Sequence, residues 1–89
     1  AMAQQEDGVE KQRKRLLYQS RHRGTKESDL FLGAFADHYL PNFTAAELSE
    51  YETILSEDDD TLFDWIYGRV KPPRDGAVLH LLLAFQFRP

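Results

Sequence analysis

The chain has 89 residues, of which 42% are hydrophobic and 12% aromatic, and its formal net charge is −4. This length allows one small globular domain, and the apolar fraction is too high for an intrinsically disordered chain. Because the sequence has no cysteine, disulfides, thiolate metal sites and cysteine nucleophiles are excluded. No apolar run approaches the roughly 20 residues that a membrane-spanning helix needs, so we expect no membrane insertion.

The chain is predicted to begin with a disordered segment, residues 1–8, whose first residues resemble a remnant of an expression vector. The folded domain is expected over residues 9–88. Its first helix is predicted from about Val9 to His22, with a thin apolar inner face. That face consists of Leu16, Leu17 and Ser20.

Charge is distributed unevenly between this first part and the rest of the chain. Residues 1–27 carry seven Lys and Arg residues against four acids, whereas residues 28–89 carry four against eleven. A basic helix on an acidic body would steer a partner into register. A solvated helix face explains the same pattern, so charge alone leaves both interpretations open.

The run RGTKE at residues 23–27 separates the first helix from a second one, predicted over residues 26–40. Gly24 has no Cβ and can adopt the left-handed conformation that ends a helix. We therefore expect Arg23 in the last turn of the first helix and Glu27 in the first turn of the second. Both charges would then sit in solvent at helix ends and interact favourably with the helix dipoles, as in many structural corners. Each would contribute only about 0.3–1 kcal/mol, so we expect that Arg23→Ala and Glu27→Ala leave the fold near that of the wild type.

The second helix is predicted to lie at the centre of the domain, because it is apolar on most of its circumference. Only one stripe of it is polar or bare, and this stripe consists of Asp29, Gly33 and Asp37. Pro41 disfavours helical geometry in the residue before it and is expected to end the helix.

Capping signals predict two further helices. Thr44 and Glu47 form a capping box that opens the third helix, in which each side chain accepts a hydrogen bond from the other residue's backbone. The three acids at residues 58–60 fit the N-cap and first turn of the fourth helix, and Gly68 ends it. We assign Trp65 of this helix to the core.

The last helix, predicted from a cap at Asp75 to about Phe87, is apolar around most of its circumference. Either it lies in a groove of its own domain, which we favour, or part of it binds a partner.

No segment alternates with period two for long enough to form a strand. The predicted fold class is therefore all-α, a compact single-domain bundle of five helices, and we expect a monomer.

The sequence gives no sign of a catalytic or metal site. A calcium loop that starts at Asp58 would need an oxygen ligand at position 62 and a glycine at position 63, which hold Leu and Phe. The three histidines are scattered without ligand spacing, and no hydroxyl side chain has a recognisable general base beside it. We therefore predict that the protein is not an enzyme and holds no metal.

An alternative function is a basic-helix adaptor or regulator that binds nucleic acid or another acidic surface. Six cationic residues would contact phosphates, namely Lys11, Arg13, Lys14, Arg15, Arg21 and Arg23. The sequence pI of about 5.2 and the lack of a recognition-helix pattern argue against nucleic acid as the ligand.

One motif and its surroundings resemble a known family. The RGxxE pattern of Arg23, Gly24 and Glu27 is followed by Asp29, an apolar helix and later the run LFDW at residues 62–65. This arrangement resembles the signature of the SdhE family of succinate dehydrogenase assembly factors, from about residue 15 to residue 73. The resemblance implies a five-helix assembly chaperone that binds the flavoprotein subunit of succinate dehydrogenase, and of fumarate reductase where present, and promotes its covalent FAD attachment.

The resemblance also implies which residues bind the partner. Arg23, Gly24 and Glu27 would form the contact centre, with Asp29 beside it and Arg15 at the periphery. FAD would be attached to the partner, so this chain would hold no cofactor tightly and would bind no nucleic acid. It would act in the cytoplasm of a bacterium, or in the mitochondrial matrix of a eukaryote after removal of a presequence.

Overall fold

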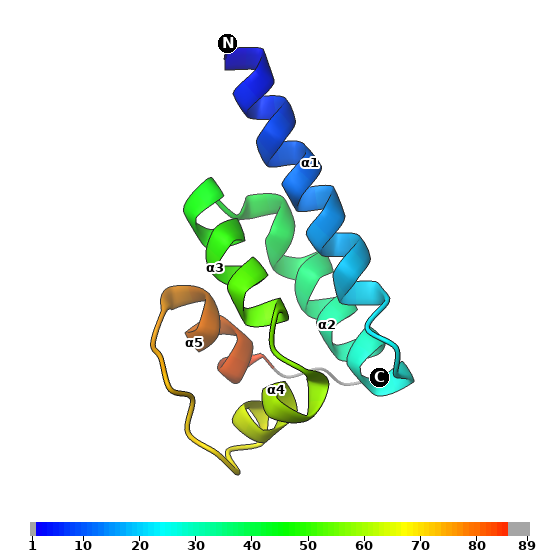
Figure 1. Ribbon diagram of the computed structural model, residues 1–89, viewed down its shortest axis with the longest axis vertical. Coiled ribbons are helices and arrows are strands. Elements are labelled where there is room, and N and C mark those ends of the chain that lie inside the picture. The colour runs from blue at the N-terminus through cyan, green and yellow to red at the C-terminus, as the bar shows by residue number, and fades with distance from the viewer. Residues whose placement is uncertain (1, 86–89) are drawn as a thin grey trace.

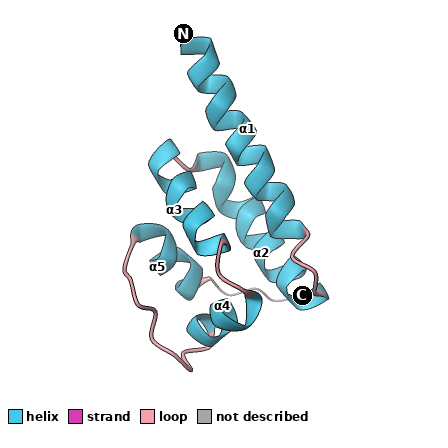
Figure 2. Ribbon diagram, in the orientation of Figure 1, coloured by secondary structure: helices cyan, strands magenta, loops and turns pink. Residues whose placement is uncertain are grey.

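The computed structural model describes residues 2–85, with side chains from residue 8 onward. Over these residues the chain forms five α-helices and one short 3₁₀ helix, and no strand (Figure 2). The elements are α1 (Met2–Arg21), α2 (Lys26–Tyr39), η1 (Leu40–Asn42), α3 (Ala45–Leu55), α4 (Asp59–Ile66) and α5 (Ala77–Ala84). The predicted all-α bundle of five helices is thereby confirmed for this part of the chain.

The helices surround a core that lies mainly between α2, α3 and α5. α1 runs antiparallel to α2 and lies beside it, while its N-terminal part projects beyond the other helices (Figure 1). α3 packs against both α1 and α5, and α4 contacts α5. The loop from α1 to α2 therefore lies at the end of the bundle opposite to the start of α1.

The bounds of α1 differ from the prediction at both ends. The helix begins at Met2 instead of Val9, so residues 2–8, which were expected to be disordered, belong to it. This stretch is rich in residues with high helix propensity, which continue a helix without any capping signal. α1 ends at Arg21, so Arg23 lies in the following loop and not in the last helical turn as predicted.

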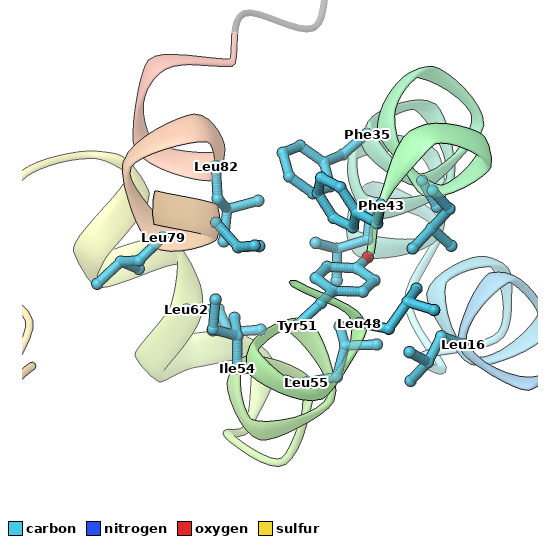
Figure 3. Close-up of a cluster of buried hydrophobic side chains, with 14 of the residues drawn as sticks. Leu16, Phe35, Phe43, Leu48, Tyr51, Ile54, Leu55, Leu62, Leu79 and Leu82 are labelled. Carbon is cyan, nitrogen blue, oxygen red and sulfur yellow. The ribbon is translucent and has the colours of Figure 1, made fainter. Parts of the chain in front are cut away.

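The core is centred on Phe35 of α2, which is fully buried. Figure 3 shows this side chain close to Phe43 and Tyr51, and their ring centroids lie 6.4 and 5.5 Å from that of Phe35. Leu16 of α1, also buried, packs in the same cluster. Trp65 is only 6% exposed, which confirms its assignment to the core.

A buried polar pair links α1 to α3 inside this core. The single proton of the Ser20 hydroxyl is donated to the carbonyl oxygen of Leu16 at 2.7 Å. The Tyr51 hydroxyl, 2.6 Å from the Ser20 oxygen, is therefore the donor of the bond between them. Burial raises the pKa of Tyr51 to about 12, because the charged phenolate would lose its hydration.

The caps of α3 and α4 are those that the sequence predicts. Thr44 and Glu47 form both hydrogen bonds of the capping box. The Asp58 carboxylate accepts a hydrogen bond from the backbone N–H of Thr61 at 2.8 Å. Hydrogen bonding to the Thr61 side chain, and next to it this backbone bond, lowers the pKa of Asp58. Two of the predicted helix ends therefore follow from local chemistry alone.

α5 is shorter than predicted and is capped differently. Its N-cap is Gly76 instead of Asp75, and the helix ends at Ala84, while residues 86 and 87 of the predicted helix lie outside the described residues. The carboxylate of Glu50 on α3 accepts a hydrogen bond from the backbone N–H of Leu79 at 2.9 Å. A side chain from another helix thus satisfies the start of α5.

The apolar circumference of α5 is explained by a groove in its own domain, which was the favoured alternative. Its buried side chains are Val78, Leu79 and Leu82. Leu81 and Leu83 are half-buried and pack against the core cluster. No helix in the described part of the chain is both long and apolar enough to cross a membrane.

Candidate functional site

The loop at residues 22–25 joins α1 to α2 and contains the start of the RGxxE motif. Gly24 has a φ of +113°, which confirms the predicted positive φ. It does not end the first helix as predicted, because α1 already ends at Arg21. A Cβ added to Gly24 would meet no atom within 4 Å, so the space beside it is open. Thr25 is the N-cap of α2, and its hydroxyl accepts from the backbone N–H of Ser28 at 3.2 Å. We refer to residues 23–29 as the corner.

The Arg23 side chain points into the domain, where it binds the junction between α3 and α4. Its two terminal nitrogens donate to the carbonyl oxygens of Leu55 and Glu57, each at 2.6 Å. Its Nε donates to the carboxylate of Asp59 at 2.9 Å. The planar guanidinium therefore satisfies carbonyls at the end of α3 and a charge at the start of α4 together.

Of two further hydrogen bonds, one attaches the corner to α4 and the other closes the corner internally. The second carboxylate oxygen of Asp59 accepts from the Ser28 hydroxyl at 2.8 Å. The backbone N–H of Arg23 donates to the carboxylate of Asp29. The Arg23 and Asp59 side chains are only 13% and 20% exposed, so this is a largely desolvated ion pair and not a surface one.

The orientation of Arg23 corrects the expectation that both corner charges sit in solvent. All three hydrogen bonds of its side chain are made within the domain, because carbonyl and carboxylate acceptors at the junction of α3 and α4 lie within its reach. Asp29 is likewise half-buried and bound to the corner backbone. The contacts seen for these two residues fix the shape of the corner, and their role in binding a partner stays a prediction.

Glu27 is placed differently, on the exposed side of the first turn of α2. Its carboxylate accepts a hydrogen bond from the hydroxyl of Tyr67 at 2.8 Å. This bond is the largest cause that raises the pKa of the Tyr67 phenol. Sequence reasoning did not associate Tyr67 with the motif, since the two residues are 40 positions apart and no local pattern connects them.

Arg15 lies on α1, away from the corner, and forms an ion pair with Glu52 of α3 at 2.8 Å.

Two other arginines of the basic helix also bind within the domain. Arg13 donates to the carbonyl oxygens of Leu40 and Phe43, and Arg21 pairs with Asp37. Much of the predicted phosphate-binding face is therefore engaged with the domain's own oxygens, which removes support from the nucleic-acid alternative.

Two open depressions of about 460 Å³ each flank the corner, and His22 lines both of them. The first also includes the exposed Tyr18, whose ring lies 4.1 Å from that of His22. The second runs past Gly24 to Leu30. The residues that the structure describes contain no group of three His, Asp or Glu side chains placed to hold a metal.

Comparison with known proteins gives one family and several relatives. The sequence profile of the Sdh5 family, described as "Flavinator of succinate dehydrogenase", matches residues 14–86. A FAD assembly factor SdhE of Acetobacter pasteurianus is 39% identical over 72 residues, which are 81% of this chain and 66% of that protein. The mitochondrial succinate dehydrogenase assembly factor 2 of Dictyostelium discoideum is 40% identical over 67 residues, which are 75% of this chain and 48% of that protein.

The protein of the same name from Scheffersomyces stipitis is 53% identical over 57 residues, which are 64% of this chain and 38% of that protein. The chain therefore spans between 38% and 66% of the length of these curated relatives. No solved structure shows significant similarity to the chain.

Proposed function

This chain belongs to the Sdh5 family of flavinators of succinate dehydrogenase, and from that premise we propose that it is an assembly factor for this enzyme. It binds the flavoprotein subunit and promotes the covalent attachment of FAD to it. The observation that supports this proposal most strongly is the family match over residues 14–86, which includes the whole corner and every helix after α1. Fumarate reductase, where the cell has it, is a second client.

The domain contributes binding and orientation, and it does not act as an enzyme. FAD stays with the flavoprotein, and this chain holds no cofactor of its own. The reacting groups then belong to the flavoprotein and its flavin, and the domain accelerates the reaction by holding its partner in a productive conformation. The corner supports this role because its backbone is held rigidly from inside while Gly24 and Glu27 face outward.

Within this proposal the five predicted partner residues have different tasks. Gly24 and Glu27 touch the flavoprotein directly, and the absence of a side chain at Gly24 allows a close approach. Arg23 and Asp29 maintain the conformation of the corner. Arg15 lies at the edge of the contact, where its exposed charge adds little to affinity.

The protein acts as a monomer in the compartment where its flavoprotein acquires FAD. This is the cytoplasm in a bacterium and the mitochondrial matrix in a eukaryote. The proposal draws support from the relatives, which are named as a bacterial FAD assembly factor and as mitochondrial assembly factors.

Co-expression tests the proposal directly. The flavoprotein is produced with and without this chain in cells that lack any flavinylation factor, and covalent FAD is measured by in-gel fluorescence. We expect a several-fold increase in covalent FAD per flavoprotein when the chain is present. Equal fluorescence in both samples, with the chain folded and abundant, would contradict the function.

Salt dependence distinguishes the proposed protein interface from binding to nucleic acid. Binding to a phosphate backbone weakens steeply and log-linearly with salt, since each neutralised phosphate releases counterions. Between about 50 and 200 mM salt, proteins that make several phosphate contacts lose about 10³-fold or more of their affinity. The affinity for the flavoprotein should fall much less over the same range. A comparable loss for the flavoprotein complex would favour an electrostatic adaptor instead.

A further inference from the structure

We infer that Tyr67, a residue outside the RGxxE motif, is a positioning residue that holds the Glu27 carboxylate in place for the flavoprotein. This inference rests on the proposed function. The Tyr67 hydroxyl donates to Oε1 of Glu27 at 2.8 Å and connects the last residue of the α4 region to the first turn of α2. Glu27 has a flexible side chain and is exposed, so this bond restricts its orientation.

The Tyr67 ring is itself in contact with two neighbouring side chains, Phe63 and Arg69. It stacks on Phe63, with the ring centroids 5.6 Å apart and the planes at 17°. The Arg69 guanidinium lies over the Tyr67 ring, 5.0 Å from its centroid, and is fixed in turn by an ion pair with Asp64 at 2.8 Å. An exposed phenol supported in this way presents its hydroxyl in one direction, which a solvated tyrosine would not do.

The support of Tyr67 and the carboxylate that it binds belong to one packed unit. Phe63 forms an edge-to-face contact with Phe31 of α2, at 5.9 Å between ring centroids. Leu62 and Trp65 bury the opposite face of α4 in the core. Since α2 carries Glu27, the donor and the acceptor are fixed relative to each other through the core as well as by their own hydrogen bond.

The chemistry of the pair indicates what the partner must supply. The Tyr67 phenol is protonated at neutral pH and is therefore a hydrogen-bond donor, and its bond to Glu27 raises its pKa further. Oε1 of Glu27 accepts from Tyr67, whereas Oε2 has no hydrogen bond with any described residue. A donor on the flavoprotein, best a guanidinium or ammonium group, can then bind an oriented carboxylate, and less conformational freedom is lost on association.

The experiment uses Tyr67→Phe, which removes the hydroxyl and keeps the supported ring. Tyr39→Phe is the matched control, because the Tyr39 ring packs against the core while its hydroxyl bonds to no described residue. Covalent FAD formation on the flavoprotein is followed against the concentration of each variant. We expect Tyr67→Phe to need a roughly two- to tenfold higher concentration for half-maximal effect, the range of one hydrogen bond. The control should match the wild type, and both melting temperatures should stay close to it.

A double mutant separates positioning from a general structural role. If Tyr67 acts through Glu27, Tyr67→Phe should have no further effect in a Glu27→Ala background, whereas independent effects would add. Unchanged flavinylation by Tyr67→Phe, additive effects in the double mutant, or full activity of Glu27→Ala would each overturn the inference while the function stands. Failure of the wild-type chain to promote flavinylation would instead overturn the proposed function.

Discussion

At the scale of single residues, the two charged side chains of the RGxxE motif differ in burial and in hydrogen-bond partners. Arg23 is mostly buried and binds two backbone carbonyls and one carboxylate of the domain, whereas Glu27 is exposed and binds one phenol. A substitution at Arg23 therefore acts first on the fold, and a substitution at Glu27 acts on the surface. Near-wild-type stability is therefore still the prediction for Glu27→Ala, which loses one exposed hydrogen bond, and it is no longer the prediction for Arg23→Ala.

Arg23→Ala is expected to destabilise the domain by about 2–4 kcal/mol, because it leaves Asp59 without its cation and two carbonyls without donors. The free energy of unfolding, measured by urea denaturation, checks this value. Arg23→Lys should recover part of the loss, since an ammonium keeps the charge but cannot bridge the three acceptors. Ordinary surface substitutions change the free energy of unfolding by up to about 0.5 kcal/mol. If Arg23→Ala changed it by no more than this, the hydrogen bonds of Arg23 would make no net contribution to stability.

Gly24 allows strain and steric contact to be separated. Its φ of +113° is unfavourable for any residue with a Cβ, while the space around it is open. Gly24→Ala and Gly24→Arg should therefore lose similar stability, about 1–2 kcal/mol, because both suffer the same backbone strain. Only the arginine adds bulk at the proposed interface. Gly24→Arg should therefore reduce covalent FAD much more than Gly24→Ala does, although both variants are equally stable. Equal flavinylation by two equally stable variants would place Gly24 outside the contact.

At the scale of elements, α1 and α3 are joined by the buried hydrogen bond between Ser20 and Tyr51. Tyr51→Phe removes the donor and leaves the Ser20 proton bound to Leu16, so no buried proton is left unpaired. We expect a loss of about 1 kcal/mol in the free energy of unfolding at neutral pH.

The same pair predicts a dependence of stability on alkaline pH. The pKa of Tyr51 is raised from 10.0 in the unfolded chain to about 12 in the fold, so above pH 10 the unfolded state releases its proton first. Its contribution to stability is fully present below pH 10 and is lost as the pH rises toward 12. The stability difference between wild type and Tyr51→Phe should therefore shrink over this interval. A constant difference from pH 9 to pH 12 would contradict the raised pKa.

α4 links the interior to the corner. Asp59 at its start binds Arg23, Tyr67 directly after its end binds Glu27, and Leu62 and Trp65 bury it in the core. The LFDW run thus anchors α4 in the core, and α4 in turn positions the two residues that bind Arg23 and Glu27. This gives a physical reason for the two patterns to occur in one domain.

At the scale of the whole molecule, a chain of 89 residues has a small core, and the loss of one large side chain is a large fraction of its stability. Trp65→Ala should cost about 3–5 kcal/mol, because the indole is almost completely buried. Thermal or urea unfolding checks this, and flavinylation should fall in parallel as α4 loosens. A stable Trp65→Ala variant that fails only in partner binding would show that Trp65 belongs to the interface.

The sequence by itself determined the features that depend on neighbouring residues. Apolar patterning predicted the first, second and last helices, capping signals at Thr44, Glu47 and Asp58 predicted the third and fourth, and Gly24 predicted the positive φ. Each of these rests on interactions within about four positions along the chain, and such interactions can be read without knowing the fold. The RGxxE and LFDW runs, as sequence patterns, were also sufficient to indicate the family.

Only the tertiary structure decided which side chains meet across the chain. Arg23 reaches Asp59 over 36 positions, Tyr67 reaches Glu27 over 40, and Glu50 caps α5 over 29. An arginine after a helix can face solvent or fold inward, and the choice depends on where unsatisfied carbonyls and carboxylates of distant segments come to lie. That placement is a product of how α2, α3 and α4 pack, so no local pattern could assign Arg23 to the interior or connect Tyr67 with the corner.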